Sequence, residues 1–303
     1  MIDSSERVLS GQLKRFAIFA VLLALCFAVP LWQLIRFSLH SAFFSYVPLV
    51  PFISGYLLRV NRSKIPAPAS PNALGMALSA ALGLGFLGWN LYLAHAGGLE
   101  TTAHLALTTA SFLFFLLASA FYFFGSNVLA SMAFPIAFLI FFIPPPQFLL
   151  DPVVSFFQHT SAWAAVTMIG IFTPVISDGL EMRVPGITLM VAPECSGIHS
   201  TMVLLMTSLL AGYMFLRSGW RRAVLVLIVA PLAILRNGFR IFVIAELCVH
   251  IGPHMIDSPI HRHGGPIFFM LSLVPFFILL FWLCRQESPR KIPAATEPIS
   301  TNL

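Results

Sequence analysis

The stretch GPIFFMLSLVPFFILLFWLC, residues 265–284, carries no charged side chain and is long enough to cross a bilayer as one helix. Other long apolar runs precede it: of the 303 residues, 58% are hydrophobic and only 9% are charged. Soluble globular domains carry about 25% charged residues. The sequence therefore predicts an all-α integral membrane protein, embedded in a lipid bilayer, and excludes a soluble globular domain.

Apolar runs of this kind predict about eight transmembrane helices. They cover residues 16–35, 41–58, 73–94, 103–124, 127–143, 197–216, 223–245 and 265–284. The first run follows Arg7, Lys14 and Arg15 and superficially resembles a signal peptide. Its apolar part is too long for one, and no small-residue cleavage site follows, so we expect a retained membrane anchor.

Residues 152–177 form a further apolar segment without a formal charge. Polar side chains interrupt its first half, namely Ser155, Gln158, His159 and Ser161. A span here would move the later basic loop to the outer side, so we expect a helix lying in, or dipping into, the outer interface. Residues 180–192 read as two short extended pieces around Pro185–Gly186, which predicts a hairpin.

Basic residues in short loops set the predicted orientation. With the N-terminus inside, most of the 17 Lys and Arg residues fall on the inner side, including Arg217, Arg221 and Arg222. Both termini are therefore expected in the cytoplasm, and the chain in the cell inner membrane. The net charge of +6 reflects this orientation. Since no basic patch interleaved with aromatic residues is present, no nucleic-acid partner is expected.

A single membrane domain is expected over residues 16–285, with an outer-face segment at residues 144–196. A cytoplasmic N-terminus, residues 1–15, precedes it. The polar, Pro-containing residues 286–303 follow it as a cytoplasmic tail with the composition of a disordered segment.

Polar residues gather first at VAPECSGIHS, residues 191–200. Cys195 and Ser196–Gly197 directly precede an apolar run, so Cys195 is expected at, or just before, a helix N-terminus. The backbone N–H groups and the positive dipole end there favour a thiolate and can receive an oxyanion during acyl transfer. A capping turn explains the same residues without any chemistry, and spacing alone favours that interpretation.

A second polar cluster, LRNGFRIF at residues 235–242, interrupts the seventh span close to its outer end. Ionisable residues inside a span are costly and usually functional. Asn237 and Arg240 are three residues apart, hence on one helical face, which favours a shared site in the bundle interior. The alternative is that the Arg240 side chain extends to the outer lipid headgroups.

The third cluster, VHIGPHMIDSPIHRHGGPIFF at residues 249–269, holds four of the nine histidines, His250, His254, His261 and His263. Neutral imidazole is the usual general base near pH 7. Gly252–Pro253 argues against a continuous helix that would align the first two histidines. Because no HExxH motif occurs in the chain, no metal site is expected.

The predicted topology places Cys195, Arg240 and His261 on the outer membrane face, at the ends of three consecutive spans. A thiol nucleophile, a guanidinium for anionic intermediates and an imidazole base are the groups that acyl transfer requires. Half of all loops lie on that face, so chance placement is one explanation. The shared side nevertheless favours an enzyme over a capping turn.

Three motifs, taken in order, resemble those of the exosortase/archaeosortase family of multipass membrane proteins. The family has a Cys-Ser-Gly-Ile run entering a span, then Asn-x-x-Arg, then a His followed at four-residue steps by Gly and an aromatic residue. The matching residues are Cys195-Ser196-Gly197-Ile198, then Asn237 and Arg240, then His261, Gly265 and Phe269. The resemblance extends over about residues 15–285, and the first five spans support it only through hydropathy.

The resemblance implies a cysteine protease or transpeptidase, needing no metal or cofactor, that cleaves C-terminal sorting signals of exported proteins. Such a signal has a short motif, often Pro-Glu-Pro, then a hydrophobic helix and a basic cluster. Carried over to this chain, Cys195 would form a thioester and His261 would be the base. Arg240 would stabilise the thiolate or the oxyanion, with Asn237 as an orienting partner.

Other residues compete for these roles. His199 and His263 are rival bases, and Arg236 is a rival cation. His199 lies one turn after Cys195, on the same face if the helix has already begun. Two other classes of function stay open: a non-enzymatic membrane component of polysaccharide or protein export, and a metal-dependent intramembrane hydrolase.

Overall fold

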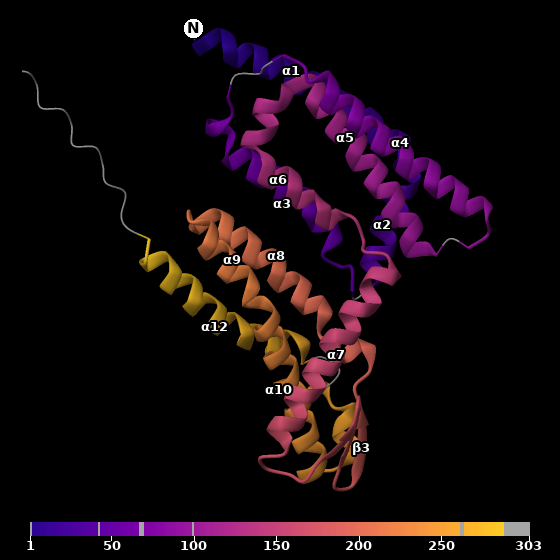
Figure 1. Ribbon diagram of the computed structural model, residues 1–303, viewed down its shortest axis with the longest axis vertical. Coiled ribbons are helices and arrows are strands. Elements are labelled where there is room, and N and C mark those ends of the chain that lie inside the picture. Colours follow the sequence, from indigo (N-terminus) through magenta and orange to yellow (C-terminus); the bar gives the residue numbers. More distant parts are fainter. Residues whose placement is uncertain (1, 42, 67–69, 99, 261–263, 288–303) are drawn as a thin grey trace, which may run out of the picture. The chain divides into compact units, whose positions relative to one another are not determined.

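The computed structural model describes residues 2–41, 43–66, 70–98, 100–260 and 264–287. They belong to two compact units, Met1–Phe156 and Phe157–Leu303, which are described one after the other. Almost all regular structure is helical, and one small sheet lies in the second unit (Figure 1). This composition, with several helices apolar enough to cross a membrane, confirms the predicted all-α integral membrane fold.

The first unit contains only helices among its described elements. In chain order they are α1 (Ile2–Cys26), α2 (Ala28–His40), η1 (Val47–Leu49), α3 (Val50–Val60), η2 (Arg62–Lys64), α4 (Ala73–His95), α5 (Thr101–Ser131), α6 (Ala133–Phe138), η3 (Leu139–Phe142) and the first part of α7 (Gln147–Ile169).

The second unit combines a helical bundle with a three-stranded antiparallel sheet of order β1-β2-β3. After the end of α7, its elements are β1 (Ile176–Asp178), β2 (Glu181–Val184), β3 (Ile187–Met190), η4 (Pro193–Ser196), α8 (Ile198–Phe215), α9 (Gly219–Leu227), α10 (Val229–His250), η5 (Pro253–Asp257) and α12 (Gly265–Arg285).

Five stretches of the described residues are long and apolar enough to cross a membrane, and up to seven if each of two bent helix pairs is one span. The five are α4, α5, α8, the α9–α10 stretch Gly219–His250, and α12. The sequence predicted about eight. The difference includes residues 41–58, where the apolar helix covers only Val47–Val60. At 1.5 Å per residue it is about 21 Å long, short of the ~30 Å hydrocarbon core.

Prolines explain both bent pairs. Helices α1 and α2 meet at Phe27 with an angle of 76°. Pro30 lies in the first turn of α2, where it has no N–H to donate and its ring disfavours a continuous helix from α1. The second bend, of 90°, separates Ala133–Phe142 from α7, and Pro144, Pro145 and Pro146 lie between them. The first bend therefore lies inside the predicted run 16–35, and the second lies at the end of the predicted run 127–143.

The helix expected over residues 152–177 has other bounds in the structure, and its interfacial placement stays a prediction. Helix α7 covers Gln147–Ile169 and then stops, and residues 176–178 pair with β2 as strand β1. Gly170 follows the helix directly and Pro174 comes four residues later, which explains the stop because neither residue favours continuation of a helix. The hairpin expected around Pro185–Gly186 is confirmed: β2 and β3 pair antiparallel, and Gly186 takes φ +84° in the two-residue turn.

Helices α4 and α5 lie side by side in the first unit (Figure 1) and meet through small residues. The buried residues of α4 are Ser79, Gly83 and Asn90. The Ser111 hydroxyl of α5 donates to the Gly83 carbonyl at 2.8 Å, and a Cβ at Gly83 would lie 3.2 Å from the Phe115 ring. Lipid is as apolar as a leucine side chain, so close packing and hydrogen bonds hold such helices together.

Two apolar clusters build the second unit. Helices α8, α9, α10 and α12 pack around the fully buried Leu204, Leu225, Phe276 and Leu283. The end of α7 and the middle of α10 pack against the sheet through a cluster that includes Ala165, Met182, Leu189 and Ala245. Cys195 is packed against this second cluster, so the sheet and α10 together fix the chain that leads into α8.

Candidate active site

Cys195 lies in η4, the short turn between β3 and α8, and is half-buried. The Cys195 amide donates to the Ala192 carbonyl at 2.8 Å, which closes the turn. Pro193 opens it, supplying a fixed φ that suits a first helical position. Helix α8 begins at Ile198, so the thiol residue lies just before a helix N-terminus, as the sequence predicted.

Gly197 separates the Cys195 turn from α8 and takes the left-handed conformation, φ +70° and ψ 12°. Residues with a side chain rarely adopt it, because Cβ approaches the following carbonyl. Space is equally limiting: a Cβ at Gly197 would lie 2.9 Å from Arg236 Nη2 and 3.0 Å from Asn237 Oδ1. Both the backbone and the neighbouring α10 therefore require glycine here.

Two side chains of α10 bind the main chain of this turn. The Asn237 amide Nδ2 donates to the Cys195 carbonyl at 2.6 Å. Arg236 Nη2 donates to the Gly197 carbonyl at 3.0 Å and to the Thr201 hydroxyl at 3.3 Å. The Thr201 hydroxyl in turn donates to the Gly197 carbonyl at 2.9 Å. The turn that carries the thiol is thus held to the seventh predicted span.

Close packing of α10 on α7 supports this arrangement. At Gly238 a Cβ would lie 2.8 Å from the Ala164 Cβ and 3.3 Å from the Ser161 carbonyl oxygen. Glycine therefore lets the two helices approach at the residue that follows Asn237. From the same helix α7, the Gln158 amide donates to the Val191 carbonyl at 3.0 Å, which fixes the strand end just before η4.

The site combines burial with positive charge. Arg236 is 8% exposed and Asn237 2% exposed, and Arg236 Nη1 has no hydrogen-bond partner among the residues that the structure describes. Arg240, half-buried, follows one turn later on α10. Two guanidinium groups from successive turns thus create a positive potential, and a positive potential favours an anionic group.

The structure brings together most of the residues that the sequence selected. Cys195, Ser196 and Gly197 form one turn, Asn237 binds it, and Arg240 lies on the Asn237 side of α10. The rival cation Arg236 binds this turn through the Gly197 carbonyl.

The histidines selected from the sequence have different outcomes. His199 is the second residue of α8, but the left-handed Gly197 interrupts the helix, so His199 is not one helical turn from Cys195. His261 and His263 lie outside the described residues. His250 and His254 do not share a helix, because α10 ends at His250 and Gly252 has φ +142°. No group of three His, Cys, Asp or Glu side chains in the described part of the chain could hold a metal ion.

Sequence reasoning missed Thr201 and the positioning contact of Gln158. Their signal was present, since polar groups in an apolar environment must find internal hydrogen-bond partners. Gln158 was noted only as an interruption of an apolar segment. Which carbonyl each side chain would reach depends on how α7, α8 and α10 pack, and that packing has no local signature in the sequence.

Comparison with known proteins gives one family match. The family described as transmembrane exosortase matches residues 38–278, which include η4, α8, α10 and the sheet. No curated protein and no solved structure matches the chain significantly.

Proposed function

Because the chain belongs to the transmembrane exosortase family, we propose that it is a membrane-embedded cysteine transpeptidase that cleaves C-terminal sorting signals of exported proteins. One observation carries the assignment to particular residues: α10 holds the Cys195 turn through Asn237 and Arg236, directly before the N-terminus of α8. A thiol in this position combines a fixed main chain with a positive surrounding potential.

Cys195 is the nucleophile of this proposal. Its sulfur attacks the scissile carbonyl carbon, a C–S bond forms, and the carbonyl oxygen becomes an oxyanion. Collapse of this intermediate breaks the C–N bond and leaves a thioester on Cys195. The acceptor nucleophile then attacks the thioester, forms its own bond to the acyl carbon and releases the thiol.

Arg240 stabilises the negative charge, first on the thiolate and then on the oxyanion. Its half-buried position on the Asn237 side of α10 supports this role. Arg236 has a different role in the proposal, because its guanidinium is engaged with the Gly197 carbonyl and Thr201. It positions the turn and adds to the positive potential.

His261 is the proposed base, on the strength of the family motif alone. It takes the proton from the Cys195 thiol and gives it to the leaving amine. When the acceptor attacks the thioester, the same imidazole takes the acceptor's proton and returns it to the Cys195 sulfur, which restores the thiol. The substrate carries a short motif, a hydrophobic helix and a basic cluster. With the basic cluster on the cytoplasmic side of the inner membrane, the motif reaches the outer face, where we place the active site.

The decisive experiment replaces Cys195 by Ala and by Ser in a cell that expresses a substrate precursor. Full-length precursor is expected to accumulate with either variant, while Cys26→Ala, a matched cysteine change in α1, leaves processing intact. In the wild-type protein, mass spectrometry of an acid-quenched reaction should find the substrate peptide on the Cys195 sulfur. Normal processing by a well-expressed Cys195→Ala protein would remove the proposal.

The base assignment has its own test. We expect His261→Gln to block processing, and His199→Gln and His263→Gln to leave it largely intact. An inactive His199→Gln protein beside an active His261→Gln protein would transfer the role of base to His199. Arg240→Gln should abolish processing without loss of membrane-inserted protein.

A further inference from the structure

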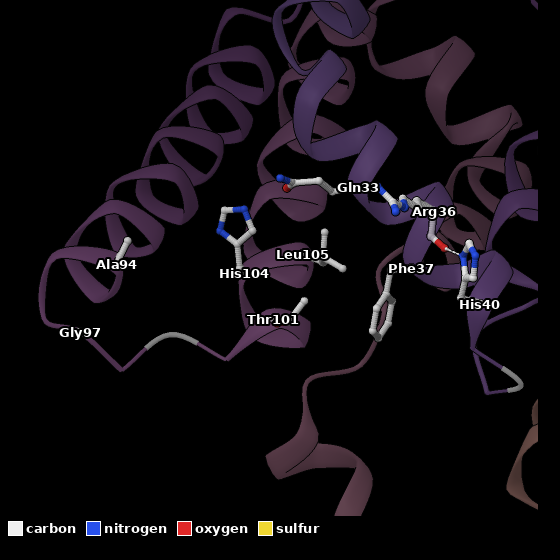
Figure 2. A pocket seen from close by; sticks show the side chains of 9 residues that line it. All are labelled: Gln33, Arg36, Phe37, His40, Ala94, Gly97, Thr101, His104 and Leu105. Carbon is white, nitrogen blue, oxygen red and sulfur yellow. Dashed lines mark hydrogen bonds between the residues drawn. The ribbon is translucent and has the colours of Figure 1, made fainter.

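A cavity of about 820 Å³ lies in the first unit, between the end of α2, the end of α4 and the start of α5. This volume is within the range of small-molecule sites, about 300–1,000 Å³. Polar side chains from two of the helices line it: Gln33, Arg36 and His40 from α2, and Thr101 and His104 from α5. In Figure 2 the Gln33 amide of α2 extends toward the His104 ring of α5.

The Arg36 side chain gives the cavity a permanent positive charge, and no carboxylate of the described residues pairs with it. The Arg36 guanidinium forms no ion pair and no hydrogen bond with any residue that the structure describes. The Arg36 residue contributes only its main-chain carbonyl, which pairs with His40 Nδ1 at 2.8 Å (Figure 2). An arginine fork directed at a polar cavity is the usual recognition element for phosphate and carboxylate groups.

Both histidines are oriented for a ligand in the same way. His104 Nδ1 lies 2.8 Å from Asn90 Oδ1, and His40 Nδ1 lies 2.8 Å from the Arg36 carbonyl. Each partner is an oxygen acceptor, so each Nδ1 carries the proton and each Nε2 is left for other groups.

The described residues that line the cavity include no Asp or Glu, and the acidic Glu100 next to the lining residue Thr101 accepts a hydrogen bond. Glu100 precedes Thr101, and its carboxylate accepts a hydrogen bond from the Thr102 hydroxyl at 2.8 Å. No side chain caps the start of α5, so its first N–H groups add a favourable dipole end for an anion. A metal ion does not fit, since no suitable group of three ligands exists among the described residues.

We propose that this cavity binds a phosphate group, carried by a phospholipid headgroup. We infer a phospholipid as the carrier of the phosphate because the site lies where two spans, α4 and α5, are joined. Helix ends of this kind lie at the level of the lipid headgroups. The surface of α4 beside the cavity is largely exposed, so an acyl chain can lie along it while the phosphate reaches Arg36.

The test measures retention of phosphatidylglycerol by the purified full-length protein in detergent, using native mass spectrometry. Arg36→Gln and His104→Gln are expected to lower lipid retention by at least about 10-fold, since each removes a charged hydrogen bond to the phosphate. Arg59→Gln, an exposed arginine in the last turn of α3, is the matched control and should retain the lipid. Equal retention by Arg36→Gln and Arg59→Gln would overturn the proposal.

A second variant keeps the test independent of folding. Glu100→Gln removes the negative charge beside the cavity and is expected to raise phosphatidylglycerol retention, an outcome that misfolding cannot produce. Inorganic phosphate separates the two sources of the ligand. If phosphate stabilises the wild type against heat but not Arg36→Gln, and phosphatidylglycerol does not displace it, the phosphate site stands and the lipid source is wrong. If Arg36→Gln changes neither the retention of phosphatidylglycerol nor the stabilisation by inorganic phosphate, the proposed site does not exist.

Discussion

The Asn237 side-chain amide donates a 2.6 Å hydrogen bond to the main-chain carbonyl of Cys195, a residue 42 positions earlier in the chain. The bond joins two motifs that the sequence could only place on the same side of the membrane. It acts on the main chain and not on the thiol, so it sets the position of Cys195 without occupying the sulfur.

Asn237→Asp tests this bond. A carboxylate cannot donate to the Cys195 carbonyl and repels it, so we expect the turn to shift. A displacement of about 1 Å can cost about 100-fold in rate, and substrate processing should fall by this order. Asn61→Asp is the control, because Asn61 is also buried and its amide donates to the Leu57 carbonyl at 2.8 Å. Equal loss of processing in both variants would contradict a specific role for Asn237.

Gly197→Ala should destabilise the protein through two separate effects. The left-handed conformation costs about 1–2 kcal/mol for a residue with a side chain, and the new Cβ would clash with Arg236 and Asn237. Gly186→Ala separates these effects, since Gly186 has φ +84° but nothing within 4 Å of its Cβ position. Thermal unfolding in detergent should show a larger fall for Gly197→Ala. Equal falls would mean that α10 adapts without cost.

Thr201→Val removes a hydroxyl that both accepts from Arg236 and donates to the Gly197 carbonyl. We expect a loss of stability of about 1–3 kcal/mol, because the buried guanidinium loses a partner. Thr207→Val is the matched control in the same helix. The Thr207 hydroxyl donates to the Val203 carbonyl at 2.8 Å, and it forms no hydrogen bond with an arginine of the described residues. Chemical denaturation measures the free energy of unfolding of both variants. A smaller loss for Thr201→Val than for Thr207→Val would contradict a stabilising contact between Arg236 and Thr201.

Gly238→Ala should push α10 away from α7, because the added Cβ would lie 2.8 Å from the Ala164 Cβ. Overpacking of this kind costs about 1–3 kcal/mol. Removing the opposing methyl group in a Gly238→Ala, Ala164→Gly double variant should restore much of the stability and of the processing rate. Gly85→Ala in α4, with nothing within 4 Å, should be neutral or stabilising. Purely additive losses in the double variant would show that the two residues do not interact.

Glu287 gives a prediction for pH. The Ser218 and Arg217 amides donate to its carboxylate, and Arg221 lies 3.4 Å away, which together lower the pKa of Glu287. A lowered folded-state pKa contributes stability above the unfolded pKa, and this stability is lost as pH falls through the folded pKa. Glu287→Gln should therefore unfold at a lower temperature than wild type at about pH 7, and the difference should shrink toward about pH 3.

Glu181→Gln is the control for that pH series. Its carboxylate pairs with Arg183 at 3.0 Å, but the arginine side chain is 65% exposed. Exposed ion pairs contribute about 0–1 kcal/mol, so little change is expected at any pH. A Glu287→Gln protein that keeps its full stability deficit at low pH would show that the carboxylate charge is not responsible.

Local chemistry explains what the sequence could predict. The hairpin followed from Pro185–Gly186 alone, because a two-residue turn needs a residue that tolerates positive φ. The position of Cys195 before a helix followed from the apolar run after Gly197. The membrane class followed from composition. None of these depends on which elements touch.

Tertiary packing decides what the sequence could not predict. Spacing along α10 could pair Asn237 with Arg240, but it could not show that the adjacent residues Arg236 and Asn237 bind two carbonyls of one turn, those of Gly197 and Cys195. Hydropathy alone also missed the break at Phe27, since an apolar run has the same mean hydropathy whether it is straight or bent by 76°. The roles of His261 and His263 remain predictions, because both lie outside the described residues.

The packing of α4 has a consequence for how freely its sequence can vary. Its buried residues are two small ones and one amide, and the rest of the helix is largely exposed. In a library of α4 variants, one apolar residue should replace another around most of the helix circumference without loss of stability. Lipid chains contact these positions, and they pack equally well against any apolar side chain. Any enlargement of Gly83 must instead displace the Phe115 ring. The helix thus contains two populations of positions, interchangeable and fixed, and the mean hydropathy of the whole helix does not distinguish them.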